Sequence, residues 1–127
     1  MIIKRLDHFV LTTADIEACI NFYVRMLGME LDQTNNRYAL RFGEQKINIH
    51  TKPAEFLPAA LYPTGGSLDF CLLIDTDKDM ATVKADIEAK GGVVELGPVI
   101  RHGSLGKMES IYLRDPDGNL VELSQYM

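Results

Sequence analysis

Apolar residues recur at helical spacing in two stretches of the chain. In the first stretch they occupy positions 16, 19, 20, 23, 24 and 27. These steps of three and four residues predict an amphipathic helix that Thr13 or Asp15 caps at its start and Gly28 ends. Similar spacing predicts a second helix over residues 79–90, which the glycine pair at 91–92 ends.

Elsewhere apolar and polar residues alternate, which is the period of a half-buried β-strand. We predict eight strands, over residues 5–12, 29–33, 37–42, 45–50, 67–74, 93–96, 108–114 and 120–125. Turn-forming residues separate neighbouring strands, as in Asn35-Asn36 and Gly43-Glu44. Each half of the chain therefore contains a strand, a helix and three more strands. This repeat predicts an α+β fold of two similar modules.

The predicted modules cover residues 1–50 and 67–127 of a single domain and are joined by a linker over 51–66. The linker contains three prolines and two glycines and is long for a connection inside a compact domain. Residues 97–106 contain three glycines and are predicted to form a second, mobile loop. We expect it to be either a surface loop or a lid over the substrate.

Composition adds limits to this picture. The chain has 127 residues, of which 46% are hydrophobic, with a net charge of −5. An acidic balance argues against a nucleic-acid partner and a polybasic membrane anchor, so we expect a small-molecule partner. No apolar run approaches the ~20 residues that span a bilayer. Cys19 and Cys71 lie in apolar runs without metal-type spacing, so we expect no disulfide and a cytoplasmic location.

Two histidines and two acidic residues fall on strand faces turned away from the predicted helices. Alternation with apolar neighbours places them there, and they are His8, His50, Asp69 and Glu122. Singly, each is more simply a hydrogen-bonded histidine or a solvated acid. Together they form a donor set for zinc, iron, manganese or nickel. Asn48 shares the face of His50 and is the alternative donor on that strand.

Several motifs resemble one known family. They are the runs LDHFVL at 6–11, NFY at 21–23 with LGM at 27–29, and DPDGNLVEL at 115–123. They resemble the vicinal oxygen chelate superfamily, which contains glyoxalase I, bleomycin and fosfomycin resistance proteins and extradiol dioxygenases. Residues 42–50 and 66–69 are most similar to the glyoxalase domain-containing protein 5 type. The resemblance covers nearly the whole chain.

The resemblance implies that the two βαβββ modules form a cupped mixed sheet around one divalent metal ion. His8, His50, Asp69 and Glu122 match the four ligand positions. Glyoxalase I has a carboxylate where His50 stands and a histidine where Asp69 stands, so the two residue types are exchanged here. Without Asp69, the others would leave a two-histidine, one-carboxylate set. Small members of the family commonly swap modules between two chains, so a module-swapped homodimer is expected.

By the same resemblance, the expected activity is that of a metal-dependent lyase or isomerase of the lactoylglutathione lyase type. Its substrate would carry two neighbouring oxygens, and Glu122 would move protons. Independently of the resemblance, Arg101 and His102 in the predicted loop are expected either to be solvated or to hold an anionic substrate group, and Tyr112 is expected to line the substrate cup. The alternatives are a ring-cleaving dioxygenase and a metal-free drug- or metabolite-binding protein of the bleomycin-resistance type.

Overall fold

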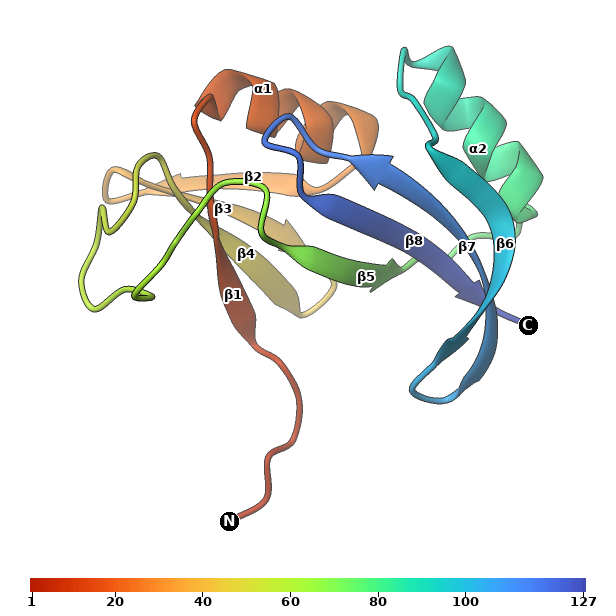
Figure 1. Cartoon of the computed structure of the whole chain (residues 1–127), viewed down its shortest axis with the longest axis horizontal. Helices are drawn as coiled ribbons and strands as arrows, with labels where there is room; N and C mark the ends of the chain where they lie inside the picture. The colour runs from red at the N-terminus through yellow and green to blue at the C-terminus, as the bar shows by residue number, and fades with distance from the viewer. The chain divides into compact units, whose positions relative to one another are not determined.

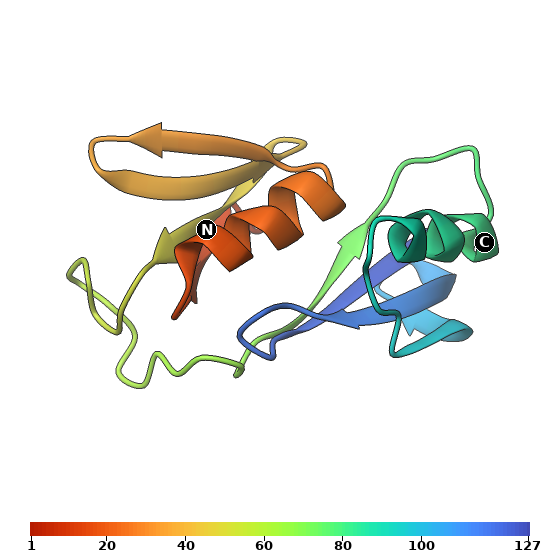
Figure 2. The same cartoon turned by 90° about the horizontal axis from the view of Figure 1, so that it is seen from above.

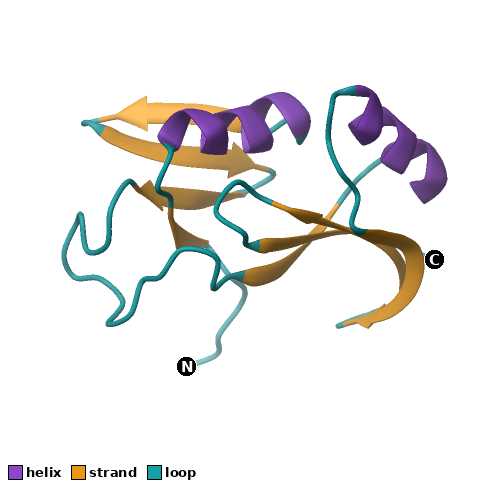
Figure 3. Ribbon diagram, turned by 45° about the horizontal axis from the view of Figure 1, so that its top comes forward, coloured by secondary structure: helices purple, strands orange, loops and turns teal.

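The computed structural model describes residues 1–127 as two units, each built around one four-stranded sheet (Figure 1). Module one is Met1–Ser67 and module two is Leu68–Met127. The segment 51–66, predicted to be a linker, belongs to module one. In each module the helix lies across one face of the sheet (Figure 2 and Figure 3). The predicted α+β fold of two similar modules is confirmed.

Module one contains strand β1, one helical segment and a three-stranded meander. Its elements are β1 (His8–Thr12), α1 (Ile16–Ile20), the π-helical continuation η1 (Asn21–Met26), β2 (Glu30–Thr34), β3 (Arg37–Phe42) and β4 (Gln45–His50). The strand order is β1-β4-β3-β2, and β1 runs parallel to β4 while the other pairs are antiparallel. Asn35 and Asn36 both adopt positive φ and close the β2–β3 turn, as their type favours.

The first helix begins and ends where its sequence signals lie. The Asp15 carboxylate accepts a hydrogen bond from the Ala18 amide at 3.1 Å, so Asp15 is the cap. Gly28 ends the helical segment with φ at +81°. Cys19 and Tyr23 are fully buried on the side of the helix that covers the sheet. The core of module one is therefore on the helix side of its sheet.

Module two repeats this arrangement. Its elements are β5 (Asp69–Leu73), α2 (Met80–Ala89), β6 (Leu96–Gly103), β7 (Gly106–Arg114) and β8 (Leu120–Tyr126). The strand order is β5-β8-β7-β6, again with a parallel pair, β5 and β8, at one side. The core residues are Met80, Ile87, Ile111, Leu113, Val121 and Leu123. Neither helical segment of the chain is long and apolar enough to cross a membrane.

The predictions of a strand over 93–96 and a mobile loop over 97–106 were wrong. Most of this region is strand β6, which forms a hairpin with β7 and starts only at Leu96. Two of its three glycines, Gly97 and Gly103, lie where an added Cβ would clash with neighbouring atoms, so they serve close packing. At Gly97, φ is +114° and an added Cβ would lie 2.9 Å from the Cα of Ile111, at a shift in the β6–β7 register.

The turn at residues 115–119 fixes the end of β7 to the start of β8. Asp115 is 4% exposed, and its carboxylate accepts hydrogen bonds from the amides of Asp117 and Asn119 and from the side chain of Asn119. The Asn119 side-chain oxygen accepts the Leu68 amide at 3.0 Å. This network therefore also positions the segment that enters β5.

Replacing Asp115 by alanine should lower the free energy of unfolding by about 2–3 kcal/mol, because buried amides lose their acceptor. Urea-induced unfolding measures this change. Asp77→Ala is the matched control, since Asp77 is exposed in another turn and should change stability by less than about 0.5 kcal/mol. Equal effects of the two substitutions would contradict the role assigned to the network.

Candidate functional site

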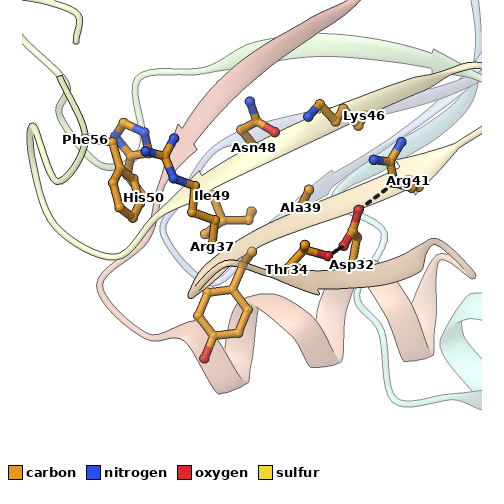
Figure 4. Close-up of a pocket in the computed structure, with 11 residues that line it drawn as sticks. Asp32, Thr34, Arg37, Ala39, Arg41, Lys46, Asn48, Ile49, His50 and Phe56 are labelled. Atoms are coloured by element: carbon orange, nitrogen blue, oxygen red, sulfur yellow. Dashed lines mark hydrogen bonds and ion pairs between the residues drawn. The ribbon is translucent and has the colours of Figure 1, made fainter. Parts of the chain in front are cut away.

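Each module has a pocket on the sheet face opposite its helix. The module-one pocket has a volume of about 360 Å³ and is formed by β2, β3, β4 and the segment after β4 (Figure 4). Its lining residues are Asp32, Thr34, Arg37, Tyr38, Ala39, Arg41, Lys46, Asn48, Ile49, His50 and Phe56. Three cations face a single carboxylate, so the pocket is positive in a chain that is negative as a whole.

Only one of these cations has an acidic partner. The Arg41 Nε lies 2.8 Å from Asp32 Oδ2, and the Thr34 hydroxyl donates to the other carboxylate oxygen. These hydrogen bonds, that from Thr34 first, hold the pKa of Asp32 below its usual value. Neither Arg37 nor Lys46 takes part in an ion pair. Two positive charges in the pocket thus have no ion-pair partner.

His50 is 8% exposed and packs against an aromatic ring. Its ring centroid lies 5.3 Å from that of Phe56 in an edge-on arrangement. The Arg37 guanidinium lies over the same Phe56 ring, 4.1 Å from its centroid. In Figure 4, Arg37, His50 and Phe56 form one end of the pocket and Arg41 with Lys46 the other.

His8 lies on the predicted face but far from His50. Its Nδ1 is 2.7 Å from the Asp7 carboxylate, and the side chain is exposed. In the parallel β1–β4 pair, His8 is level with Lys46 whereas His50 is level with Thr12. Four residues of strand span roughly 13 Å. Because a histidine nitrogen binds a metal at about 2.1 Å, this separation along the strands disfavours one ion shared by His8 and His50.

The module-two pocket has a volume of about 340 Å³ and the opposite charge. It is lined by Asp69, Glu95, Leu96, Arg101, Tyr112, Leu120 and Glu122. Three carboxylates here face one guanidinium. Glu95 also forms a two-pronged ion pair with Arg114, at 3.1 and 3.2 Å. Asp69 and Glu122, from the adjacent parallel strands β5 and β8, therefore remain the carboxylates available to a ligand.

Hydrogen bonds fix the Glu122 carboxylate in place. Its Oε2 lies 2.7 Å from the Ser110 hydroxyl and 3.1 Å from that of Ser124. The two hydroxyls are 2.6 Å apart, and the Cys71 thiol is 3.2 Å from Ser124. The Cys71 thiol donates to Ser124, one serine hydroxyl donates to the other, and the other serine hydroxyl donates to Glu122 Oε2. Both serines are fully buried, which makes this support rigid.

Two of the three expected substrate contacts lie in this pocket. Arg101 Nε donates to the Tyr112 hydroxyl at 2.9 Å. Burial is the main cause that raises the pKa of Tyr112, opposed by the bond from Arg101 and reinforced by Glu122. His102 is exposed, pairs with Lys107 on the next strand and does not line the pocket.

Neither module by itself brings together three histidine, cysteine or acidic side chains as a metal cluster. Asp69 and Glu122 supply two oxygen donors, and His8 and His50 lie in the other module. Two residues that line the module-one pocket, Arg37 and Phe56, were not predicted from the sequence. The alternation of Arg37 and Arg41 along β3 could have revealed the first, whereas no periodicity marks Phe56 in its irregular segment.

The chain is similar in sequence and in structure to known proteins. Residues 5–123 match the model of the Glyoxalase/Bleomycin resistance protein/Dioxygenase superfamily. Virulence protein STM3117 of Salmonella typhimurium is 48% identical over all of this chain and 88% of its own, and its crystal structure superposes with a TM-score of 0.93, covering 100% of both chains.

Two further relatives match most of this chain, and the second of them is named as a probable enzyme. Glyoxalase domain-containing protein RDO1 of Mycosarcoma maydis is 46% identical over 98% of this chain and 69% of its own. A probable lactoylglutathione lyase of Vibrio cholerae is 30% identical, over 95% of this chain and 90% of its own. Of these three relatives, the two that are 48% and 46% identical to this chain have names that do not state a reaction.

The alkylation rate of the Cys71 thiol can test whether the Glu122 carboxylate lies beside it. Burial raises its pKa, the bond with Ser124 opposes that rise, and the Glu122 charge adds to it. Glu122→Gln removes that charge, so the pKa of the Cys71 thiol should fall. The fraction of thiolate at pH 8 should therefore rise, by up to about tenfold if the pKa falls by one full unit. Iodoacetamide alkylation of metal-free protein measures the rate, since Cys71 is exposed and Cys19 is fully buried.

The control for this measurement is Glu109→Gln. Glu109 precedes Ser110 on β7 and therefore projects to the other face of the sheet. It should leave the alkylation rate unchanged. Equal rates in wild type and Glu122→Gln would show that the carboxylate does not act on the thiol.

Proposed function

Because the chain belongs to the Glyoxalase/Bleomycin resistance protein/Dioxygenase superfamily, we propose that it is a metal-dependent enzyme. Its substrate would be a small molecule with two neighbouring oxygens, and its reaction that of a lyase or isomerase of the lactoylglutathione lyase type. The observation that carries this proposal is the pair Asp69 and Glu122 in one acidic pocket. Two oxygen donors on adjacent strands suit a divalent cation.

His8 is the proposed nitrogen ligand. The Asp7 carboxylate holds its Nδ1, which leaves Nε2 as the free donor. A carboxylate bound to the far nitrogen is the usual support of a metal-binding histidine, because it fixes the tautomer and the ring orientation. His50 lacks this support, packs against Phe56 and lies far from His8 along the strands. The proposed ligands are therefore His8, Asp69 and Glu122.

These three ligands leave coordination positions for two substrate oxygens. A bound metal ion would polarise those oxygens and stabilise negative charge that develops on them. Only one Glu122 oxygen is not held by the serines, so this carboxylate would accept and return a proton only when it is displaced from the metal. Arg101 and Tyr112 would orient the substrate from the wall of the same pocket. The proposed ligands come from both modules, and we propose a homodimer with exchanged modules as the assembly that unites them.

Metal binding is the first test. Protein freed of metal and titrated calorimetrically with nickel, zinc or manganese, and anaerobically with iron(II), should bind one ion per chain. Asp69→Asn and Glu122→Gln should each weaken binding by at least about tenfold, since each removes a charged ligand. Glu109→Gln on the opposite face of the same sheet is the control and should bind as wild type. No binding of any of these ions would leave a metal-free binding protein as the function.

The histidine assignment has its own test. His8→Ala should weaken metal binding by orders of magnitude, and Asp7→Asn by about 10–100-fold through the lost support of the ring. His50→Ala should stay within a few-fold of wild type. The reverse order, with His50→Ala losing the metal and His8→Ala retaining it, would overturn the assignment of His8.

A further inference from the structure

We infer that module one contains a binding site for a small organic or inorganic oxyanion, between Arg37, Lys46 and Asn48. The proposed metal function does not include this site, and its argument uses only residues of module one. The shared chemistry of its ligands is a carboxylate or phosphate group. The first observation is that two cations without an ion-pair partner, Arg37 and Lys46, line a pocket of about 360 Å³.

The shape of the pocket follows from a small side chain in its floor. Ala39 is level with Asn48 on β4 and with Asp32 on β2, so a single methyl group lies at the centre of three strands. Long cationic side chains flank it at both ends of β3, Arg37 before it and Arg41 after it. Figure 4 shows Ala39 and Asn48 between these ends. The hollow thus has polar walls and can admit a ligand of a few heavy atoms.

The Arg37 guanidinium is oriented for anion binding by its contact with Phe56. Phe56 supports its face at 4.1 Å, which leaves the N–H groups at its edge as donors. The position of Phe56 is fixed in turn by Glu55, whose carboxylate accepts hydrogen bonds from both the amide and the hydroxyl of Thr51. These bonds from Thr51 also keep the pKa of Glu55 below its usual value, so it stays ionised. The segment after β4 therefore builds part of the site.

Electrostatics favours an anion over a neutral ligand at this place. Asp32 is the one carboxylate in the lining, and it is engaged by Arg41 and Thr34. Lys46 is partly buried and has no ion-pair partner of its own. A pocket lined by one sign of charge concentrates ligands of the opposite sign, and charged hydrogen bonds to carboxylate or phosphate are stronger than neutral ones. The Asn48 amide adds an uncharged donor between the cations.

The experiment uses metal-free, ¹⁵N-labelled full-length protein at low ionic strength. Succinate and inorganic phosphate are titrated separately, with succinamide as the uncharged counterpart of succinate. We expect at least one anion to shift the backbone amide signals of Ala39 and Asn48, with an affinity that falls as salt is added. Succinamide should leave them in place. Which anion binds more tightly distinguishes a carboxylate from a phosphate ligand.

Substitutions then locate the site. Arg37→Gln and Lys46→Gln should each weaken anion binding by about tenfold or more, the loss of one charged hydrogen bond. Arg25→Gln makes the same change of net charge on the helical segment and should stay within twofold. Thermal melting checks that each variant folds. The inference is overturned if neither anion binds better than succinamide, or if Arg25→Gln weakens binding as much as Arg37→Gln.

Because the protein in this experiment holds no metal, its result is separable from the metal titration. Anion binding without metal binding would retain the site in module one and remove the proposed catalytic metal. Metal binding without anion binding would do the opposite.

Discussion

The pleat of the strands, with a helix on only one side of each sheet, determines where chemistry can occur in this protein. Successive side chains point to opposite faces, so every apolar residue that packs under a helix sends its neighbours to the uncovered face. Ile47 and Ile49 are buried under α1, which places Lys46, Asn48 and His50 together on the other side. In module two, Val121 and Leu123 are buried on the helix side of β8, which places Glu122 and Ser124 on the uncovered face. The core and the pockets are thus two consequences of one alternation.

The two uncovered faces have opposite electrostatic character despite their common topology. In module one the pocket holds Arg37 and Lys46 without acidic partners, whereas the pocket of module two holds Asp69 and Glu122 beside a single guanidinium, that of Arg101. The net charge of −5 by itself predicts an acidic surface and gives no sign of a basic pocket. This separation of sign between the modules is the basis for the two proposed ligands, a cation at the acidic face and an anion at the basic one.

Local signals in the sequence were sufficient for most elements and for the faces of the strands, but not for β6 or for positions along the strands. Asp15, Gly28 and the turn that starts at Asp115 were recognisable, because capping and turn residues act within a few positions. Gly97 was misleading, since a glycine that permits close backbone approach looks in sequence like one that permits motion. The distance between His8 and His50 depends on strand register, and pairing between strands 40 residues apart leaves no local pattern.

Register also shows which positions of the two modules correspond. Asp69 is level with Leu120, and Glu122 is level with Cys71, two residues farther along β5. In module one His8 takes the place of Asp69, and the residue two farther along, Val10, is level with Asn48. Asn48, not His50, is therefore the counterpart of Glu122, and an amide stands where the other module has a carboxylate. His50 corresponds instead to Ser124, a residue that in module two supports the neighbouring carboxylate. The same topology thus places His50 in the wall of the module-one pocket, whereas the acidic donors Asp69 and Glu122 lie in module two.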